Sequence, residues 1–205
     1  MGSSIRRILI PLAYLRIRRD DKFLEEVTIP LALTALTMAT IFLAGSRFSI
    51  YGIPGLINSI ISYLQLLSGF YITALAAIAT FNREGMDDPM LGDPPTLDTP
   101  SLQEPEKLSR RRFLCFLFGY LAFGSLLLYI GGTIITLAAP IIRSEVSESV
   151  RILLRWGIAT VYIFCTFNIL VTSMLGMYYL TDRLHRITPT NVETAIDHDD
   201  LKDDI

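Results

Sequence analysis

The charged residues of this chain gather into a few clusters, and four long runs between them contain no Asp, Glu, Lys, Arg or His. These runs cover 27–46, 48–82, 113–142 and 156–181. Each reaches the roughly 20 residues that a helix needs to cross a hydrocarbon core about 30 Å thick. Because lipid offers no partner for backbone polar groups, and the runs lack the alternation of barrel strands, we predict helices. The expected fold is an all-α integral membrane bundle of four transmembrane helices with an N-terminal amphipathic segment.

The runs divide the chain into five regions. These are a basic interfacial leader (1–26), a transmembrane hairpin (27–81), a loop rich in proline and acidic residues (82–112), a second transmembrane hairpin (113–181) and an acidic tail (182–205). The second run is long and contains Pro54. It fits either one tilted helix that begins near Pro54 or a helix with a re-entrant part.

Lys and Arg are distributed unequally between the two sides of the predicted membrane. Fourteen of them lie in the leader, the loop 82–112 and the tail, whereas four lie in the two other connections. The positive-inside rule places the basic side in the cytoplasm. We therefore expect a multi-pass protein of the cell inner (plasma) membrane with cytoplasmic N- and C-termini.

Two basic clusters border the spans on the cytoplasmic side. The leader segment 5–19 has aliphatic residues at roughly helical spacing, which fits either an interfacial helix on anionic headgroups or a frayed leader that only fixes topology. A second cluster precedes the third span. The candidate lipid-headgroup anchors are Arg6, Arg7, Arg16, Arg18, Arg19, Arg110, Arg111 and Arg112.

Small and polar residues recur at helical spacing within the spans. Helices in lipid associate through close packing of such residues and through side-chain hydrogen bonds. We predict helix packing, with pore lining as the alternative, for Asn58, Gln65, Gly69, Thr73, Ala77, Ser125, Gly132, Thr136, Asn168, Thr172 and Gly176. In the first span Ala32, Ala35 and Ala39 share a face in the same way. Such faces also predict a homo-oligomer.

The sequence contains no arrangement that indicates an enzyme. Cys115 and Cys165 lie in apolar runs and form no metal or redox motif, while His185 sits between arginines. We expect no catalytic residues, no cofactor and no metal site. A net charge near zero gives no indication of direct nucleic-acid binding. The uncharged runs also argue against coupled transport and voltage sensing, which use ionisable groups inside the membrane.

Two functions fit these features. One is a membrane effector or small oligomeric channel that alters permeability when a soluble partner contacts residues 84–107 or the acidic tail. The other is an anchor or scaffold subunit that holds a cytosolic complex at the membrane through the same segments. In outline the chain resembles the small multipass membrane components of bacterial phage-defence systems, such as retron-associated membrane effectors. This resemblance is one of architecture and carries over no residue. It implies abortive infection, in which a soluble sensor activates the membrane protein and the inner membrane is disrupted.

Overall fold

Four long helices dominate the structure, a computed structural model that describes residues 8–18, 22–45, 49–51, 54–80, 86–87, 95–97, 106–145 and 147–183. The elements in chain order are η1 (3₁₀, Ile10–Arg16), β1 (Ile17–Arg18), η2 (π, Leu24–Thr28), α2 (Ile29–Ala44), α3 (Leu56–Thr80), β2 (Thr96–Leu97), β3 (Glu106–Lys107), α4 (Arg110–Glu145), α5 (Glu148–Tyr178) and η4 (π, Tyr179–Arg183). Four helical segments are long and apolar enough to cross a membrane: Leu24–Ala44, Leu56–Thr80, Arg110–Ile142 and Glu148–Thr181. The predicted four-span membrane bundle is confirmed.

The second span is a single helix. From Leu56 to Thr80 the backbone is continuous α-helix, and the chain enters it directly after Pro54 and Gly55. Its 25 residues measure about 37 Å, which suffices to cross the membrane with some tilt. No re-entrant part occurs within the described residues 54–80.

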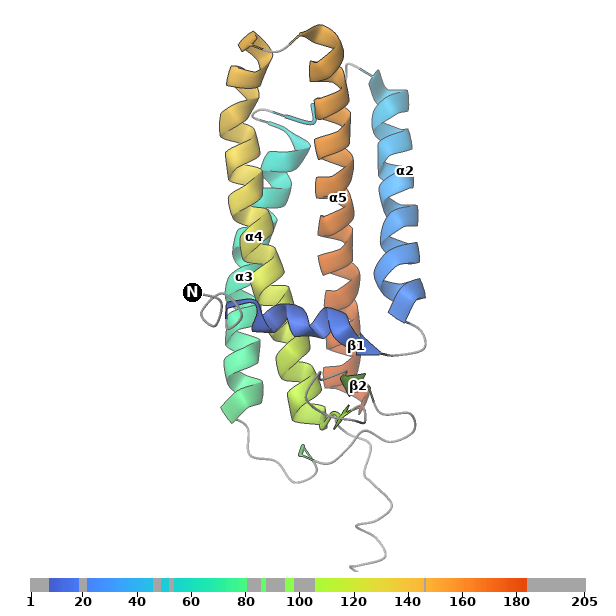
Figure 1. Ribbon diagram of the computed structural model, residues 1–205, viewed down its shortest axis with the longest axis vertical. Helices are drawn as coiled ribbons and strands as arrows, with labels where there is room; N and C mark the ends of the chain where they lie inside the picture. Colours follow the sequence, from blue (N-terminus) through green and yellow to red (C-terminus); the bar gives the residue numbers. More distant parts are fainter. Residues whose placement is uncertain are drawn as a thin grey trace, which may run out of the picture.

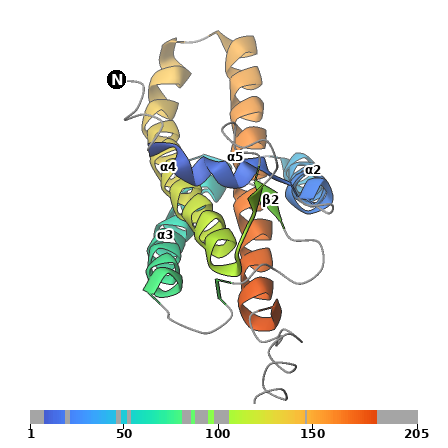
Figure 2. The ribbon, with the colours of Figure 1, turned by 60° about the horizontal axis from the view of Figure 1, so that its bottom comes forward.

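The helices are arranged as a row that is crossed by the leader. α3 packs along α4, α4 packs on α5, and α2 packs on the other side of α5. The leader element η1 runs across α4 rather than along it (Figures 1 and 2). We call the end where α4 begins the basic end, because Arg110 to Arg112 lie there, and the end where α4 turns into α5 the far end.

The loop between α3 and α4 is partly folded at the basic end. β2 pairs with the leader strand β1, placing Leu97 opposite Ile17, and β3 adds to the other side of β2. Met86, Leu97 and Leu108 are buried in the same apolar cluster as Tyr14 and the first turns of α4. These residues of the loop 82–112 are therefore packed into the bundle.

Candidate functional site

A buried carboxylate lies where the leader meets the first span. Glu26 in η2 is 6% exposed, and the phenol of Tyr14 on η1 donates to its Oε1 at 2.7 Å. Lys22, one turn earlier, places Nζ 3.9 Å from Glu26 Oε2. Because an isolated charge is costly to remove from water, a buried carboxylate needs such partners. The Tyr14 phenol and the Lys22 ammonium of the leader thus both contact the Glu26 carboxylate.

Lys22 also closes the end of η1. Its ammonium donates to the carbonyl oxygens of Tyr14, Leu15 and Ile17 at 3.1, 2.7 and 2.8 Å. Carbonyls at the C-terminal end of a helix lack partners within the helix and carry partial negative charge. The Tyr14 carbonyl also accepts from the N–H of Ile17, and the Lys22 ammonium lies 5.3 Å from the centre of the Tyr14 ring. Lys22 therefore connects the end of the leader to the start of the first span.

The backbone of Glu26 is held by a second set of contacts. An α-helix would pair its carbonyl with the N–H of residue 30, but that residue is Pro30, which has no N–H. The chain is π-helical here, and Asn168 Nδ2 on α5 donates to the Glu26 carbonyl at 2.7 Å. The hydroxyl of Tyr120 on α4 donates to Asn168 Oδ1 at 2.7 Å, and the Tyr120 ring stacks on Tyr14 with centroids 5.1 Å apart.

These contacts form one network, which we call the Glu26 network: Tyr14, Lys22, Glu26, Tyr120 and Asn168. It joins the leader, the start of the first span, α4 and α5. The network has a structural role, because each of its hydrogen bonds holds one element of the fold against another. Within the described part of the chain, no three His, Cys, Asp or Glu side chains gather as metal ligands would.

The predicted packing residues of α4 and α5 lie between helices. Ser125, Gly132, Thr172 and Gly176 are buried, and Thr136 and Asn168 are half-buried. A Cβ on Gly132 would collide with the Tyr162 hydroxyl and lie 2.8 Å from Ile61 Cγ1 of α3. A Cβ on Gly176 would lie 2.9 Å from Leu117 Cδ2. These glycines therefore allow the close approach that their spacing predicts.

Most of the small residues of the first two spans lie on the outer surface of the bundle. Asn58 is half-buried, but the remaining candidates on α3 are exposed, as are the three alanines of α2: Gln65, Gly69, Thr73, Ala77, Ala32, Ala35 and Ala39. These exposed residues do not pack against another described helix of the same chain, and their role in packing against a second copy or in lining a pore stays a prediction. α3 instead buries larger side chains, such as Leu64 and Tyr71, whose hydroxyl hydrogen-bonds Ser173 on α5.

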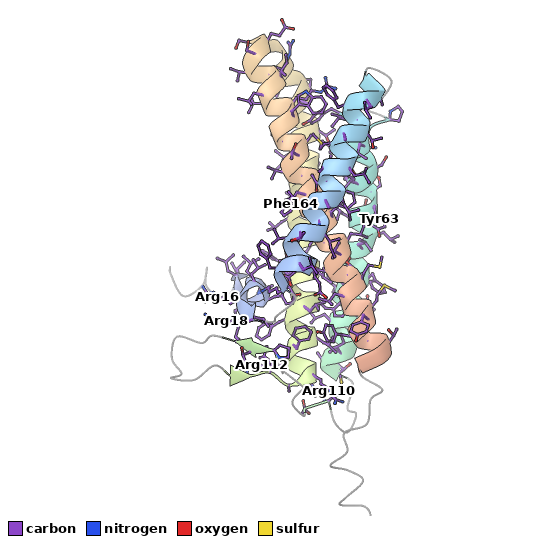
Figure 3. All side chains as sticks on the ribbon, turned by 90° about the vertical axis from the view of Figure 1, so that its right-hand side faces the viewer. Arg16, Arg18, Tyr63, Arg110, Arg112 and Phe164 are labelled. Atoms are coloured by element: carbon purple, nitrogen blue, oxygen red, sulfur yellow. The ribbon has the colours of Figure 1, made fainter. Side chains whose placement is uncertain are left out.

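The predicted headgroup anchors divide into two groups. Arg111 forms an ion pair with Asp87, with Nε 2.9 Å from Oδ1, and Arg110 is buried. Contact of these two arginines with lipid headgroups stays a prediction. Arg16, Arg18 and Arg112 are exposed, on the side of the molecule where η1 crosses α4 (Figure 3). Arg6, Arg7 and Arg19 lie outside the described residues, as does the acidic tail from residue 184 onward.

Sequence reasoning missed Tyr14, Lys22 and Glu26 as members of a site. Counting uncharged runs started the first span at Val27, directly after Glu26, whereas the helical segment starts at Leu24. The one signal in the sequence was the position of Pro30, which leaves the Glu26 carbonyl without its helical partner. Comparison with protein-family models, curated proteins and solved structures finds no match for this chain.

Proposed function

We propose that this protein is a non-enzymatic effector of the inner membrane that self-associates through α3 and alters permeability when a soluble partner engages its cytoplasmic segments. The proposed biological setting is antiviral defence of the abortive-infection type. The observation that supports it is the outer face of α3, where Gln65, Gly69, Thr73 and Ala77 are all exposed.

This face combines an amide with small residues, beside apolar side chains that suit contact with lipid. Leu66, Phe70 and Ile72 are exposed on α3, as Leu36 is on α2 and Val161 is on α5. The Gln65 amide lies one turn from Gly69, and a Cβ added at Gly69 would meet no neighbouring atom within 4 Å. An amide without a hydrogen-bond partner is unfavourable in hydrocarbon, and a glycine allows another backbone to approach closely. A second copy of α3 provides both.

Association through α3 also gives a physical route to permeability. In an oligomer the hydroxyl and amide groups of Asn58, Gln65 and Thr73 would face one another or a column of water. Rings of such groups can line a passive pore without any ionisable residue. The same side chains therefore support both the homo-oligomer and the pore.

The proposed trigger acts at the basic end, which the positive-inside rule assigns to the cytoplasm. The loop that would receive a partner is joined to the leader through β2 and β1, and the leader is joined to the first span through Tyr14 and Glu26. A partner that displaces β2 would therefore disturb the contacts that hold the first span. This connection favours a triggered effector over a passive anchor.

The experiment is expression at moderate level with a dye that reports membrane potential. Wild-type protein should depolarise the cells, and Gly69→Leu should abolish depolarisation because a large side chain blocks close approach. Gly131→Leu is the matched control, because Gly131 on α4 also faces open space. Two results would contradict the proposal. One is equal depolarisation by both variants. The other is no depolarisation by the wild-type protein, whether it is expressed alone or together with its genomic neighbours.

A scaffold is the second candidate, favoured by the folded three-stranded sheet that joins loop and leader. Replacing residues 98–105 with a Gly/Ser segment of equal length preserves β2 and β3 but removes the Pro/acidic sequence. A scaffold should then lose a co-purifying soluble partner while membrane potential stays normal throughout. Depolarisation by the wild type would argue against this candidate.

A further inference from the structure

The described segment 8–18 of the leader has one buried and one exposed side. Its buried side carries Tyr14, which packs against α4, and Ile17 follows in β1. Its exposed side carries four aliphatic residues: Ile8, Leu9, Ile10 and Leu15. The leader runs across the spanning helices (Figure 1), so it lies along the plane of the membrane. An amphipathic segment in this orientation suits the boundary between headgroups and acyl chains.

The start of the first span fixes the depth of this segment. Phe23 and Leu24 are exposed and begin the span, and Lys22 holds them directly against the end of η1. The exposed aliphatic residues of the leader and the first residues of the span therefore lie at one membrane boundary. Water is a poor environment for so many adjoining apolar side chains, whereas the interfacial region of a leaflet covers them.

Arginines flank this apolar surface. Arg16 at the end of η1 and Arg18 in β1 are exposed, and Arg112 lies on the same side with its guanidinium 5.7 Å from the Phe116 ring (Figure 3). Guanidinium groups bind phosphate oxygens with two parallel hydrogen bonds. Arg110 lies nearby but is buried.

We propose that η1 and β1 form a docking face for anionic lipids of the leaflet at the basic end, with lipid phosphates bound by Arg16 and Arg18. A lipid fits better than a soluble acidic partner because the arginines adjoin the exposed aliphatic side of the same short segment. The contacts of Tyr14 and Lys22 with Glu26 hold the segment in place before lipid arrives. The face is thus preformed, and this inference is independent of the proposed effector function.

The test uses the full chain with Cys115 and Cys165 replaced by alanine and a fluorophore attached at Ile10→Cys. The protein is reconstituted in phosphatidylcholine vesicles that contain brominated phosphatidylglycerol or brominated phosphatidylcholine as quencher. The brominated anionic lipid should quench more strongly. Its preference should fall about fivefold for each of Arg16→Gln and Arg18→Gln, the factor expected for one basic residue at an anionic surface.

Arg155→Gln is the matched control, an exposed arginine at the far end, and it should leave the preference unchanged. Raising the salt concentration should weaken the wild-type preference, which tests the proposal even if a variant folds poorly. Equal quenching by both lipids, or no quenching by either, would overturn the proposal. Competition by soluble glycerol phosphate as strong as that by the lipid would overturn the assignment to a lipid surface.

Discussion

The two ends of the bundle differ in the partners of their polar side chains. At the basic end side chains bond to one another, as in Tyr14 with Glu26 and Tyr120 with Asn168, as well as to backbone carbonyls, as in Asn168 with Glu26. At the far end the phenols of Tyr51 and Tyr162 each donate to a backbone carbonyl, that of Arg155 at 2.8 Å and that of Leu128 at 3.2 Å. Contacts between specific side chains can be lost or changed one by one, whereas a carbonyl is present whatever the sequence. The basic end is therefore where the sequence specifies the arrangement of leader, loop and spans.

Apolar packing follows the same division. One buried cluster at the basic end includes Tyr14, Phe113 and Leu117 and takes in residues of the loop. A smaller cluster at the far end joins Ile41 of α2, Leu64 of α3 and Ile163 of α5. The far end relies on close approach at Gly132, where Tyr162 fits against α4. Variants can test whether the polar network or the close packing contributes more to the free energy of unfolding.

Removing Glu26 should have the largest effect on stability. Glu26→Ala leaves Tyr14 and Lys22 without their carboxylate, and loss of one partner of a buried charged pair costs about 3 kcal/mol or more. The measurement is the free energy of unfolding in mixed micelles titrated with SDS. Glu148→Ala is the control, because this exposed carboxylate at the far end, 3.8 Å from Arg151, should contribute less than about 1 kcal/mol. Similar losses for both variants would remove the distinction between the ends.

Adding one methyl group at Gly132 should have the next largest effect. Gly132→Ala places a Cβ against the Tyr162 hydroxyl and Ile61, and overpacking of this kind costs about 2 kcal/mol. Gly131→Ala is the matched control because a Cβ there meets nothing within 4 Å. The same unfolding titration compares the two. If Gly132→Ala lowers the free energy of unfolding no more than Gly131→Ala, the far end packs less closely than the structure indicates.

The smallest expected effect is the response of Tyr51 to alkaline pH. Burial raises the pKa of the Tyr51 phenol, and the positive charge of Arg155 opposes part of this shift. Because the folded state favours the neutral phenol, this contribution to stability is complete below about pH 10, the ordinary tyrosine value, and is lost as pH rises through the raised pKa. Wild-type protein should lose more stability than Tyr51→Phe between about pH 9 and about pH 11. An identical loss in both would contradict the role of this phenol.

Much of the fold could be predicted from the sequence, because the membrane imposes a minimum length of uncharged helix on each span. The spacing of Asn168, Thr172 and Gly176 also predicted the packing face of α5. The buried face of α3 could not be predicted in this way. Gly69 and Thr73 form a stripe of small residues, yet α3 buries Leu64 and Tyr71 instead, and Tyr71 contacts Phe118 of α4 and Ser173 of α5. Spacing identifies a face but does not say whether the neighbour is another helix of the chain, a second copy or lipid.

The Glu26 network escaped prediction for a related reason. Charged residues mark the borders of spans in a sequence, so a carboxylate at such a border gives no sign that it is buried. Its burial depends on the leader folding back across α4, and this long-range contact leaves no periodic signal in the sequence. The single local sign was Pro30, whose missing N–H frees a carbonyl that Asn168 then binds.

The most direct test of this account is whether the leader lies across α4 in the membrane. Pro11 Cβ lies 3.9 Å from the position of a Cβ at Gly119, within the range that a disulfide requires. In a background with Cys115 and Cys165 replaced by alanine, Pro11→Cys with Gly119→Cys should form a disulfide within one chain under mild oxidation, which a maleimide-polymer gel shift detects. The additional change Glu26→Ala should lower the yield. Free, fully labelled cysteines in the parent pair would contradict a leader that is fixed to the bundle.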